Sequence, residues 1–111
     1  MDAIFPEPIR SLAPVDLGLD GATALLSQSD GHQILFMQFE RDVELGEHSH
    51  EAQWGTVLEG KIDLTIDGEL NTFRKGDYYF ISAGVTHSAR IYAGYADVTF
   101  FNSPDRYSPS V

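Results

Sequence analysis

The sequence predicts an all-β protein, with short strands closed into a sandwich or a barrel. Turn-forming residue pairs recur about every eight to twelve residues, which is typical of such folds. No window of the 111-residue chain shows a helical period over three turns. Hydrophobic residues make up 42% of the chain, which is enough for a core. A small barrel also removes exposed sheet edges and can hold one small ligand.

The N-terminal residues 1–20 differ from the rest of the chain. They contain several prolines among scattered apolar residues, and we expect an arm that lies against the body of the protein. Residues 21–111 are expected to form a single β-barrel domain. Apolar runs bounded by turn residues predict its first strands at 23–26, 33–40 and 54–58. Residues 41–46 are interpreted as a turn that leads the chain onward.

The clearest local signal lies in residues 61–70. Ile62, Leu64 and Ile66 alternate with polar residues and are followed by Asp67-Gly68. Asp-Gly after such an alternation predicts a β-hairpin, because both turn residues must accept positive φ. Turns at 76–77 and 83–84 then separate the last predicted strands, which are residues 78–81, 86–92 and 96–102.

Two histidines separated by one residue, His48 and His50, carry most of the functional information. On an extended backbone, side chains two positions apart point to the same face. His87, in a later predicted strand, could complete a metal site with them. Neutral imidazole is the commonest protein ligand for zinc, iron, copper and nickel. An isolated pair of this kind is more often two surface histidines, and His32, at a turn, is expected to be solvated.

Composition excludes several other chemistries. The absence of cysteine excludes disulfides, iron–sulfur clusters and thiol nucleophiles. The net charge of −10 repels phosphate backbones, so we expect no nucleic-acid partner. No apolar stretch is long enough to span a membrane and the N-terminus does not read as a secretory signal, so we expect no membrane association and a cytoplasmic protein.

Two motifs in order resemble those of the cupin superfamily, in particular its small bacterial single-domain members. Residues 46–60 are similar to the first motif, which runs from histidine-x-histidine through a glutamate or glutamine to a glycine turn. Residues 76–87 are similar to the second. Fifteen residues separate Gly60 from Gly76, and they contain the predicted hairpin. Ser82 and Ile91 depart from the second motif, at positions that are not ligands. The resemblance covers residues 34–101 and implies a double-stranded β-helix, or jelly-roll barrel.

The resemblance also implies a set of metal ligands. Carried over by position, these are His48, His50, His87 and, where a glutamate is usual, Gln53. A neutral amide leaves the full +2 charge on a divalent ion, which makes the site more attractive to an anionic ligand. Glu51 is a less favoured alternative ligand. Manganese, iron, nickel, cobalt or zinc would fit such a site almost equally.

Strand alternation extends these expectations to the neighbouring residues. Trp54 should point away from the metal, toward the outer layer or a partner subunit. Gly55 should leave room for a ligand beside the metal. Ala89 and Ile91 should line the interior. One of Tyr78 and Tyr79 should point inward, and the sequence does not say which.

Three functions are compatible with these features. The first is a metal-dependent cupin acting on a small organic molecule, of isomerase, lyase or dioxygenase type. Its catalytic residues are unknown, with Glu51 the nearest candidate for a general base. The second is a module that binds or senses a small molecule without turning it over. The third is a structural protein with incidental histidines. With the third, the arm could exchange onto a second barrel; the resemblance to small cupins, which commonly form such dimers, implies a homodimer through that arm.

Overall fold

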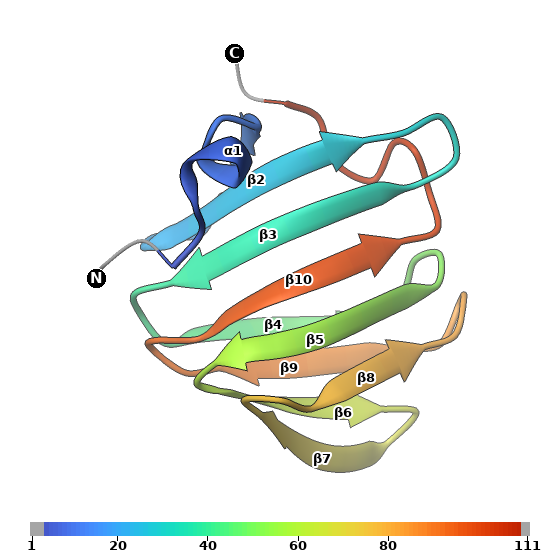
Figure 1. Cartoon of the computed structure of the whole chain (residues 1–111). Helices are drawn as coiled ribbons and strands as arrows, with labels where there is room; N and C mark the ends of the chain where they lie inside the picture. Colours follow the sequence, from blue (N-terminus) through green and yellow to red (C-terminus); the bar gives the residue numbers. More distant parts are fainter. Residues whose placement is uncertain (1–3, 110–111) are drawn as a thin grey trace.

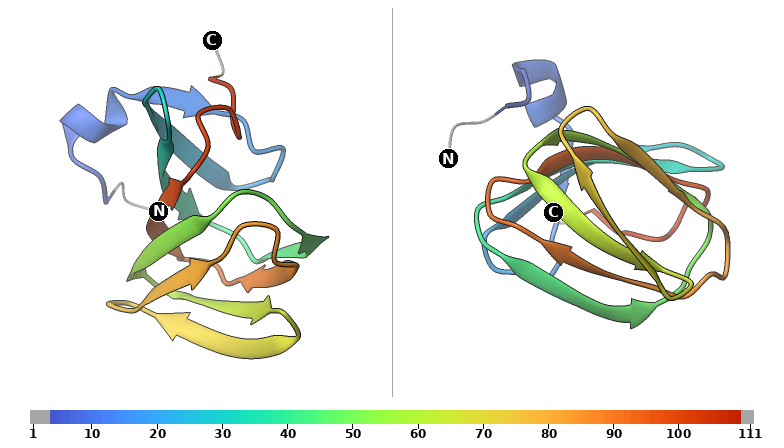
Figure 2. Two further views of the ribbon diagram at one scale, coloured as in Figure 1. Left: turned by 90° about the vertical axis from the view of Figure 1, so that its right-hand side faces the viewer. Right: turned by 90° about the horizontal axis from the view of Figure 1, so that it is seen from below.

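Two antiparallel sheets form the body of the protein and face one another across an apolar interior (Figures 1 and 2). The structure is a computed structural model that describes residues 4–109. One sheet has the strand order β1-β2-β3-β10-β5-β8, and the other has the order β4-β9-β6-β7. Seen from below, the two sheets enclose the interior between them (Figure 2, right). The predicted all-β fold is confirmed.

Strand bounds follow the predicted segments closely in the body of the chain. The strands of the first sheet are β1 (Ala13–Val15), β2 (Ala22–Gln28), β3 (Gln33–Phe39), β5 (Gln53–Glu59), β8 (Tyr78–Ile81) and β10 (Ala96–Phe101). Those of the second are β4 (Val43–His48), β6 (Lys61–Ile66), β7 (Glu69–Arg74) and β9 (His87–Ile91). The β6–β7 hairpin turns at Asp67 (φ 50°) and Gly68 (φ 81°), the positive values that were predicted.

One predicted element is wrong. Residues 41–46 were interpreted as a turn, yet Val43–His48 form β4, which pairs along β9 at the edge of the second sheet. The segment has only two apolar residues, Val43 and Leu45, and both are half-buried because the strand covers the cavity from one side. With one apolar pair around Glu44 and then Gly46 and Glu47, the alternation is too short to predict a strand.

The N-terminal arm is built into the barrel. A short helix, α1 (Glu7–Arg10), is followed by β1, which pairs with β2. Phe5 is 6% exposed and packs edge-on against Phe36 of β3, with ring centroids 5.6 Å apart. The described part of the arm therefore packs against the first sheet. None of the helices in the described residues is long and apolar enough to cross a membrane.

The core fills the space between the sheets with alternating residues of both. In β3, for example, Leu35, Met37 and Phe39 are buried while the residues between them are half-exposed. The sequence of buried and exposed positions in β10 places Asp97, Thr99 and Phe101 inside. These inward positions line up across β5 and β3, and they set the chemistry of the interior.

Candidate metal centre

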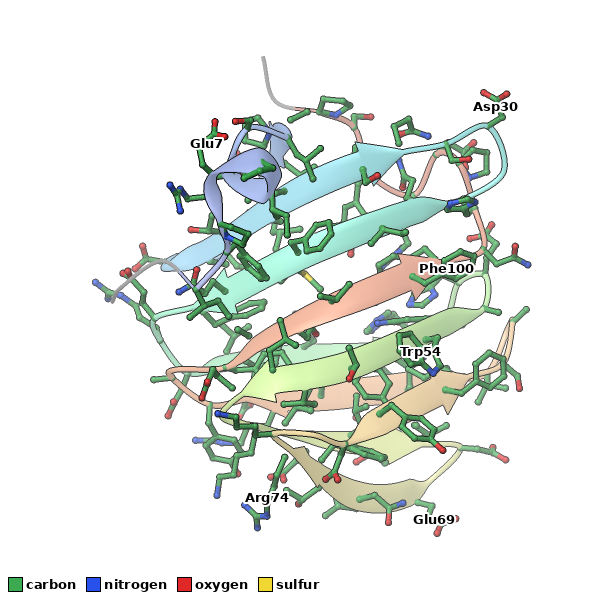
Figure 3. All side chains as sticks on the ribbon, in the orientation of Figure 1. Glu7, Asp30, Trp54, Glu69, Arg74 and Phe100 are labelled. Atoms are coloured by element: carbon green, nitrogen blue, oxygen red, sulfur yellow. The ribbon has the colours of Figure 1, made fainter. Side chains whose placement is uncertain are left out.

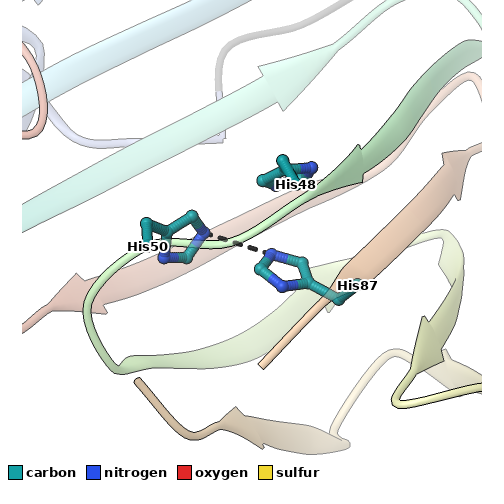
Figure 4. Close-up of side chains that lie close together, drawn as sticks. All are labelled: His48, His50 and His87. Atoms are coloured by element: carbon teal, nitrogen blue, oxygen red, sulfur yellow. Dashed lines mark hydrogen bonds between the residues drawn. The ribbon is translucent and has the colours of Figure 1, made fainter. Parts of the chain in front are cut away.

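Three histidines meet at one end of the interior (Figure 4). Two lie in strands of the second sheet, and the third lies in the loop after β4. His48 ends β4, His50 follows two residues later, and His87 begins β9 directly opposite His48. Their ring centroids lie 4.2–5.4 Å apart. One nitrogen from each ring can be chosen so that all three lie within 4.8 Å of one another. The sequence predicted this meeting, and the structure brings the three residues together.

A register shift in β4 turns His48 inward. Leu45 pairs with Ala89 and His48 pairs with His87, so three steps on β4 match two steps on β9. Without this bulge, strict alternation from the inward Leu45 would point His48 outward. The extra residue thus restores the inward direction just before the histidine pair.

Backbone carbonyls fix the same tautomer in all three rings. The Nδ1 atoms of His48, His50 and His87 lie 2.8, 2.7 and 2.9 Å from the carbonyl oxygens of Gly46, Glu51 and Val85. A carbonyl only accepts, so each Nδ1 must carry the proton. Each Nε2 then presents a free lone pair. Orientation of a ligand histidine by a hydrogen bond from its other nitrogen is the usual arrangement at metal sites.

The contact between His50 and His87 fits a shared cation. Their Nε2 atoms are 3.1 Å apart (dashed line in Figure 4). With both protons on Nδ1, two lone pairs face each other, which is favourable only with a positive charge between them. Two nitrogens each about 2.1 Å from one ion, at a right angle, would be about 3.0 Å apart. The donor set therefore fits a divalent transition metal.

Burial and a nearby cation keep these rings neutral. His87 is 3% exposed, and His50 is half-buried. Desolvation lowers the pKa of both imidazoles, and the guanidinium of Arg106 lowers each of them further. A neutral imidazole is the form that binds a metal.

Gln53 lies in the same cavity as the histidines. It faces inward on β5, opposite Phe101, whose ring packs edge-on against His50 at 5.5 Å. Glu51 is exposed and does not line the cavity, so the structure gives no support to its suggested roles as ligand or general base. His32 lies outside the cluster, half-buried, and stacks on Phe100.

Strand alternation decides whether the aromatic residues of β5 and β8 point into or away from the interior. Trp54 points outward, as expected, and stacks on the exposed Tyr78 on the outer face of the first sheet (Figure 3). Tyr79 is the tyrosine that points inward, with 4% exposure. Ala89 and Ile91 line the interior, as predicted.

The expectation for Gly55 is wrong. A Cβ atom there would lie 2.4 Å from Cζ of Tyr79, so the space above this glycine holds the tyrosine ring and not a ligand. Gly55 sits between Tyr79 on β8 and Thr99 on β10. The missing side chain lets the Tyr79 ring cross β5 and bring its hydroxyl to Asp97, 3.5 Å away.

The histidines open onto a cavity of about 390 Å³. Most of its walls are apolar, with side chains such as Met37, Leu64 and Ile81. Sequence reasoning missed several polar residues of the lining: Asp97 and Arg106, and also Glu44 and Tyr107. The alternation in 96–101 is a signal that could have placed Asp97 inside. Arg106 follows the last strand, and nothing in the sequence placed it near the histidines.

Comparison with known proteins identifies the family. Residues 36–101 match the family model of the cupin domain, so the chain belongs to the cupin family. Among solved structures, an RmlC-like cupin from Shewanella frigidimarina NCIMB 400 has a TM-score of 0.75 at 22% identity, covering 95% of this chain and 94% of that one. KdgF from Halomonas sp. has a TM-score of 0.75 at 20% identity, covering 96% of both chains.

A third similar structure is part of a larger protein. Oxalate decarboxylase of Bacillus subtilis, which is described with Mn(II) centres, has a TM-score of 0.72 at 18% identity. The match covers 87% of this chain and 29% of the decarboxylase. No curated protein matches the chain. Likeness at these identities is evidence for the cupin barrel, and the chemistry must be argued from the site itself.

Proposed function

We propose that this protein is a metal-binding cupin that acts on a small organic molecule. His48, His50, His87 and Gln53 would hold a divalent transition metal: manganese, iron, nickel, cobalt or zinc. The observation that carries the proposal is the meeting of three histidine rings at one end of a cavity, with one nitrogen of each within 4.8 Å of the others and each Nδ1 hydrogen-bonded to a backbone carbonyl. Three protein nitrogens and one amide oxygen would leave positions for a ligand.

The chain's own residues favour an anionic or oxygen-rich ligand. Arg106 lines the cavity, and its guanidinium lies over the rings of Phe101 and Tyr107. Its Nε is buried and has no hydrogen-bond partner in the structure, so a donor remains for a ligand oxygen. A bound ion would supply Lewis-acid polarisation of a carbonyl or carboxylate oxygen. Isomerase, lyase and dioxygenase chemistry are all compatible with such a site.

A binding or sensing module is the second candidate. The mostly apolar walls of the cavity favour it, because few polar side chains converge beside the histidines. A turnover screen separates the two candidates. Restoration of turnover by manganese, iron, nickel, cobalt or zinc in metal-stripped protein supports the enzyme, whereas ligand binding without turnover supports the module.

His50→Ala tests the metal site. We expect wild-type protein, loaded with Mn²⁺ or Zn²⁺ and dialysed, to retain about one ion per chain. The variant should lose the ion and stay folded, because His50 follows β4 and contributes one half-buried ring. Elemental analysis measures the ion, and circular dichroism checks the fold.

His32→Ala is the matched control, since His32 is also half-buried and ring-stacked but lies outside the cluster. It should retain the metal. Stoichiometric metal in His50→Ala would defeat the proposed ligand set.

We further propose that two copies associate by exchanging the N-terminal arm. The arm is anchored by Phe5 and by the β1–β2 pairing, and the same contacts can form between two barrels. The loop between β1 and β2 contains Gly18 and Gly21, both at positive φ, and it would serve as the hinge.

A further inference from the structure

The wall of the cavity contains a polar cluster that the proposed metal centre does not use; Asp97 and Tyr79 line the cavity, and Tyr95 is buried behind them. Its members are Asp97 on β10, Tyr79 on β8 and Tyr95, which immediately precedes β10. The inward positions of β10 run from Phe101, which contacts His50, to Asp97. Four residues of an extended strand span about 13 Å, so the cluster lies well along the interior from the histidines.

The two oxygens of the Asp97 carboxyl have different surroundings. Oδ2 accepts hydrogen bonds from the hydroxyls of Tyr95 and Tyr79, at 2.5 and 3.5 Å. Oδ1 is buried and makes no hydrogen bond that meets geometric criteria, and the hydroxyl of Thr99, the next inward residue of β10, is also buried without one. Asp97 is 1% exposed, and it is part of the cavity lining. Buried carboxyl oxygens are rarely left without a partner, so Oδ1, together with the Thr99 hydroxyl beside it, can form hydrogen bonds with a ligand in the cavity.

The state of the carboxyl indicates what kind of group fits there. Burial raises the pKa of Asp97 to about 7, and the hydroxyls of Tyr95, Thr99 and Tyr79 partly offset that rise. Both tyrosines donate to Oδ2, so a proton on the acid would sit on Oδ1. Oδ1 therefore accepts when the group is ionised and donates when it is protonated. A hydroxyl group does both, whereas a carbonyl or an ammonium group matches only one state.

We propose that Asp97, held by Tyr79 and Tyr95, binds a hydroxyl group of the ligand through Oδ1. The ligand is then a small hydroxylated molecule, with an apolar part along the walls and its other end at the histidines. The cluster acts in recognition. This inference rests on the proposed function only in taking the same cavity as the ligand site, and its test does not require a metal.

The test compares two neutral probes of similar shape, benzyl alcohol and toluene, by NMR titration of metal-free and Zn²⁺-loaded protein. An apolar cavity without a polar partner favours toluene, because burying an unpaired hydroxyl is costly. We expect wild-type protein to bind benzyl alcohol at least as tightly as toluene. Asp97→Leu, similar in volume and apolar, should shift the ratio of the two dissociation constants toward toluene by about tenfold or more.

Asp63→Asn is the matched control. Asp63 also accepts from a tyrosine hydroxyl, that of Tyr92 at 2.6 Å, but it does not line this cavity. In Asp63→Asn, the ratio of the dissociation constants for benzyl alcohol and toluene should equal the wild-type ratio. An unchanged ratio in Asp97→Leu, or no binding of benzyl alcohol to wild type, overturns the proposal.

A second measurement covers the case in which Asp97→Leu does not fold. In wild-type protein labelled with ¹³C at aspartate, the Asp97 carboxyl resonance should shift on addition of benzyl alcohol and stay in place with toluene. Equal responses to both probes would contradict the inference. Elemental analysis of the same samples reports the metal separately, so loss of metal binding with a retained hydroxyl preference counts against the metal centre alone.

Discussion

At the scale of single residues, the candidate site depends on partners that the sequence does not display. The types and spacing of His48, His50 and His87 predicted a cluster, and the structure assembles it. The carbonyls that hold each Nδ1 come from nearby backbone, which any sequence offers, so the tautomer could not be predicted. Gly55 shows the same limit: the gap was predicted, but the side chain that fills it comes from β8.

Asp97 gives a residue-scale prediction of pH-dependent stability. Its pKa is about 7 in the folded protein and near 3.8 when exposed, because burial disfavours the charged form. Between these values the folded state binds more protons at Asp97 than the unfolded state does, so the contribution of Asp97 to the free energy of unfolding falls as pH rises from about 4 to about 7. Asp97→Asn lacks this proton. Relative to the variant, wild type should therefore lose stability across that window and stay level above it.

Urea unfolding of both proteins at several pH values, in EDTA, measures this difference. Burial lowers the pKa of His50 and His87, so the contribution of these residues to the free energy of unfolding falls as pH falls below 6.5, the usual pKa of histidine. That contribution is common to both proteins and cancels in the comparison. A difference that is independent of pH, or that rises toward pH 7, would contradict a buried acid at position 97.

At the scale of elements, alternation predicted strands well where one face is apolar and the other polar. The 61–66 segment and its Asp-Gly turn are the clearest case, because both the period and the turn chemistry are local. β4 was missed because the buried face of an edge strand over a cavity needs few apolar residues. Its bulge is set by pairing with β9, which lies about forty residues away in the sequence, so local pattern carries no sign of it.

The bulge leads to a prediction that contrasts two single-residue deletions. Deleting Gly46 makes the step from Leu45 to His48 equal to the step from Ala89 to His87, so a regular ladder still points His48 inward. This variant should fold and bind about one metal ion per chain. Deleting Ser49 makes His48 and His50 adjacent in sequence, and adjacent side chains on an extended chain point to opposite faces. That variant should lose the ion.

Elemental analysis and thermal melting of the two deletion variants check this contrast. Both remove one residue from the same stretch of chain, so each controls for the other. The account of the bulge fails if the Gly46 deletion loses the metal while remaining folded, or if the Ser49 deletion retains it.

At the scale of the whole molecule, the two sheets divide the work. The second sheet and the loop after β4 supply the three histidines, and the first sheet supplies Gln53, Tyr79 and Asp97. The histidine end of the cavity was predicted because its residues lie within the two motifs, 46–60 and 76–87, whereas Tyr95 and Asp97 of the carboxyl cluster lie outside both. The outer face of the first sheet carries the arm over β3. Farther along the same sheet, β5 and β8 carry the exposed aromatic residues Trp54 (labelled in Figure 3), Tyr78 and Phe80.

The arm gives the prediction at this scale. Deleting residues 1–20 removes Phe5, α1 and β1, and it leaves β2 as an unpaired edge with Ala24 and Leu26 uncovered. If the arm is exchanged between copies, full-length protein should elute as a dimer on sizing chromatography with light scattering, and the truncated protein should elute as a monomer or aggregate. Tyr78→Ser, which removes an aromatic ring on the exposed part of the same sheet, should leave the dimer intact because that face takes no part in the exchange. A truncated protein that remains a dimer would rule out arm exchange, and dissociation by Tyr78→Ser would place the contact on the aromatic face instead.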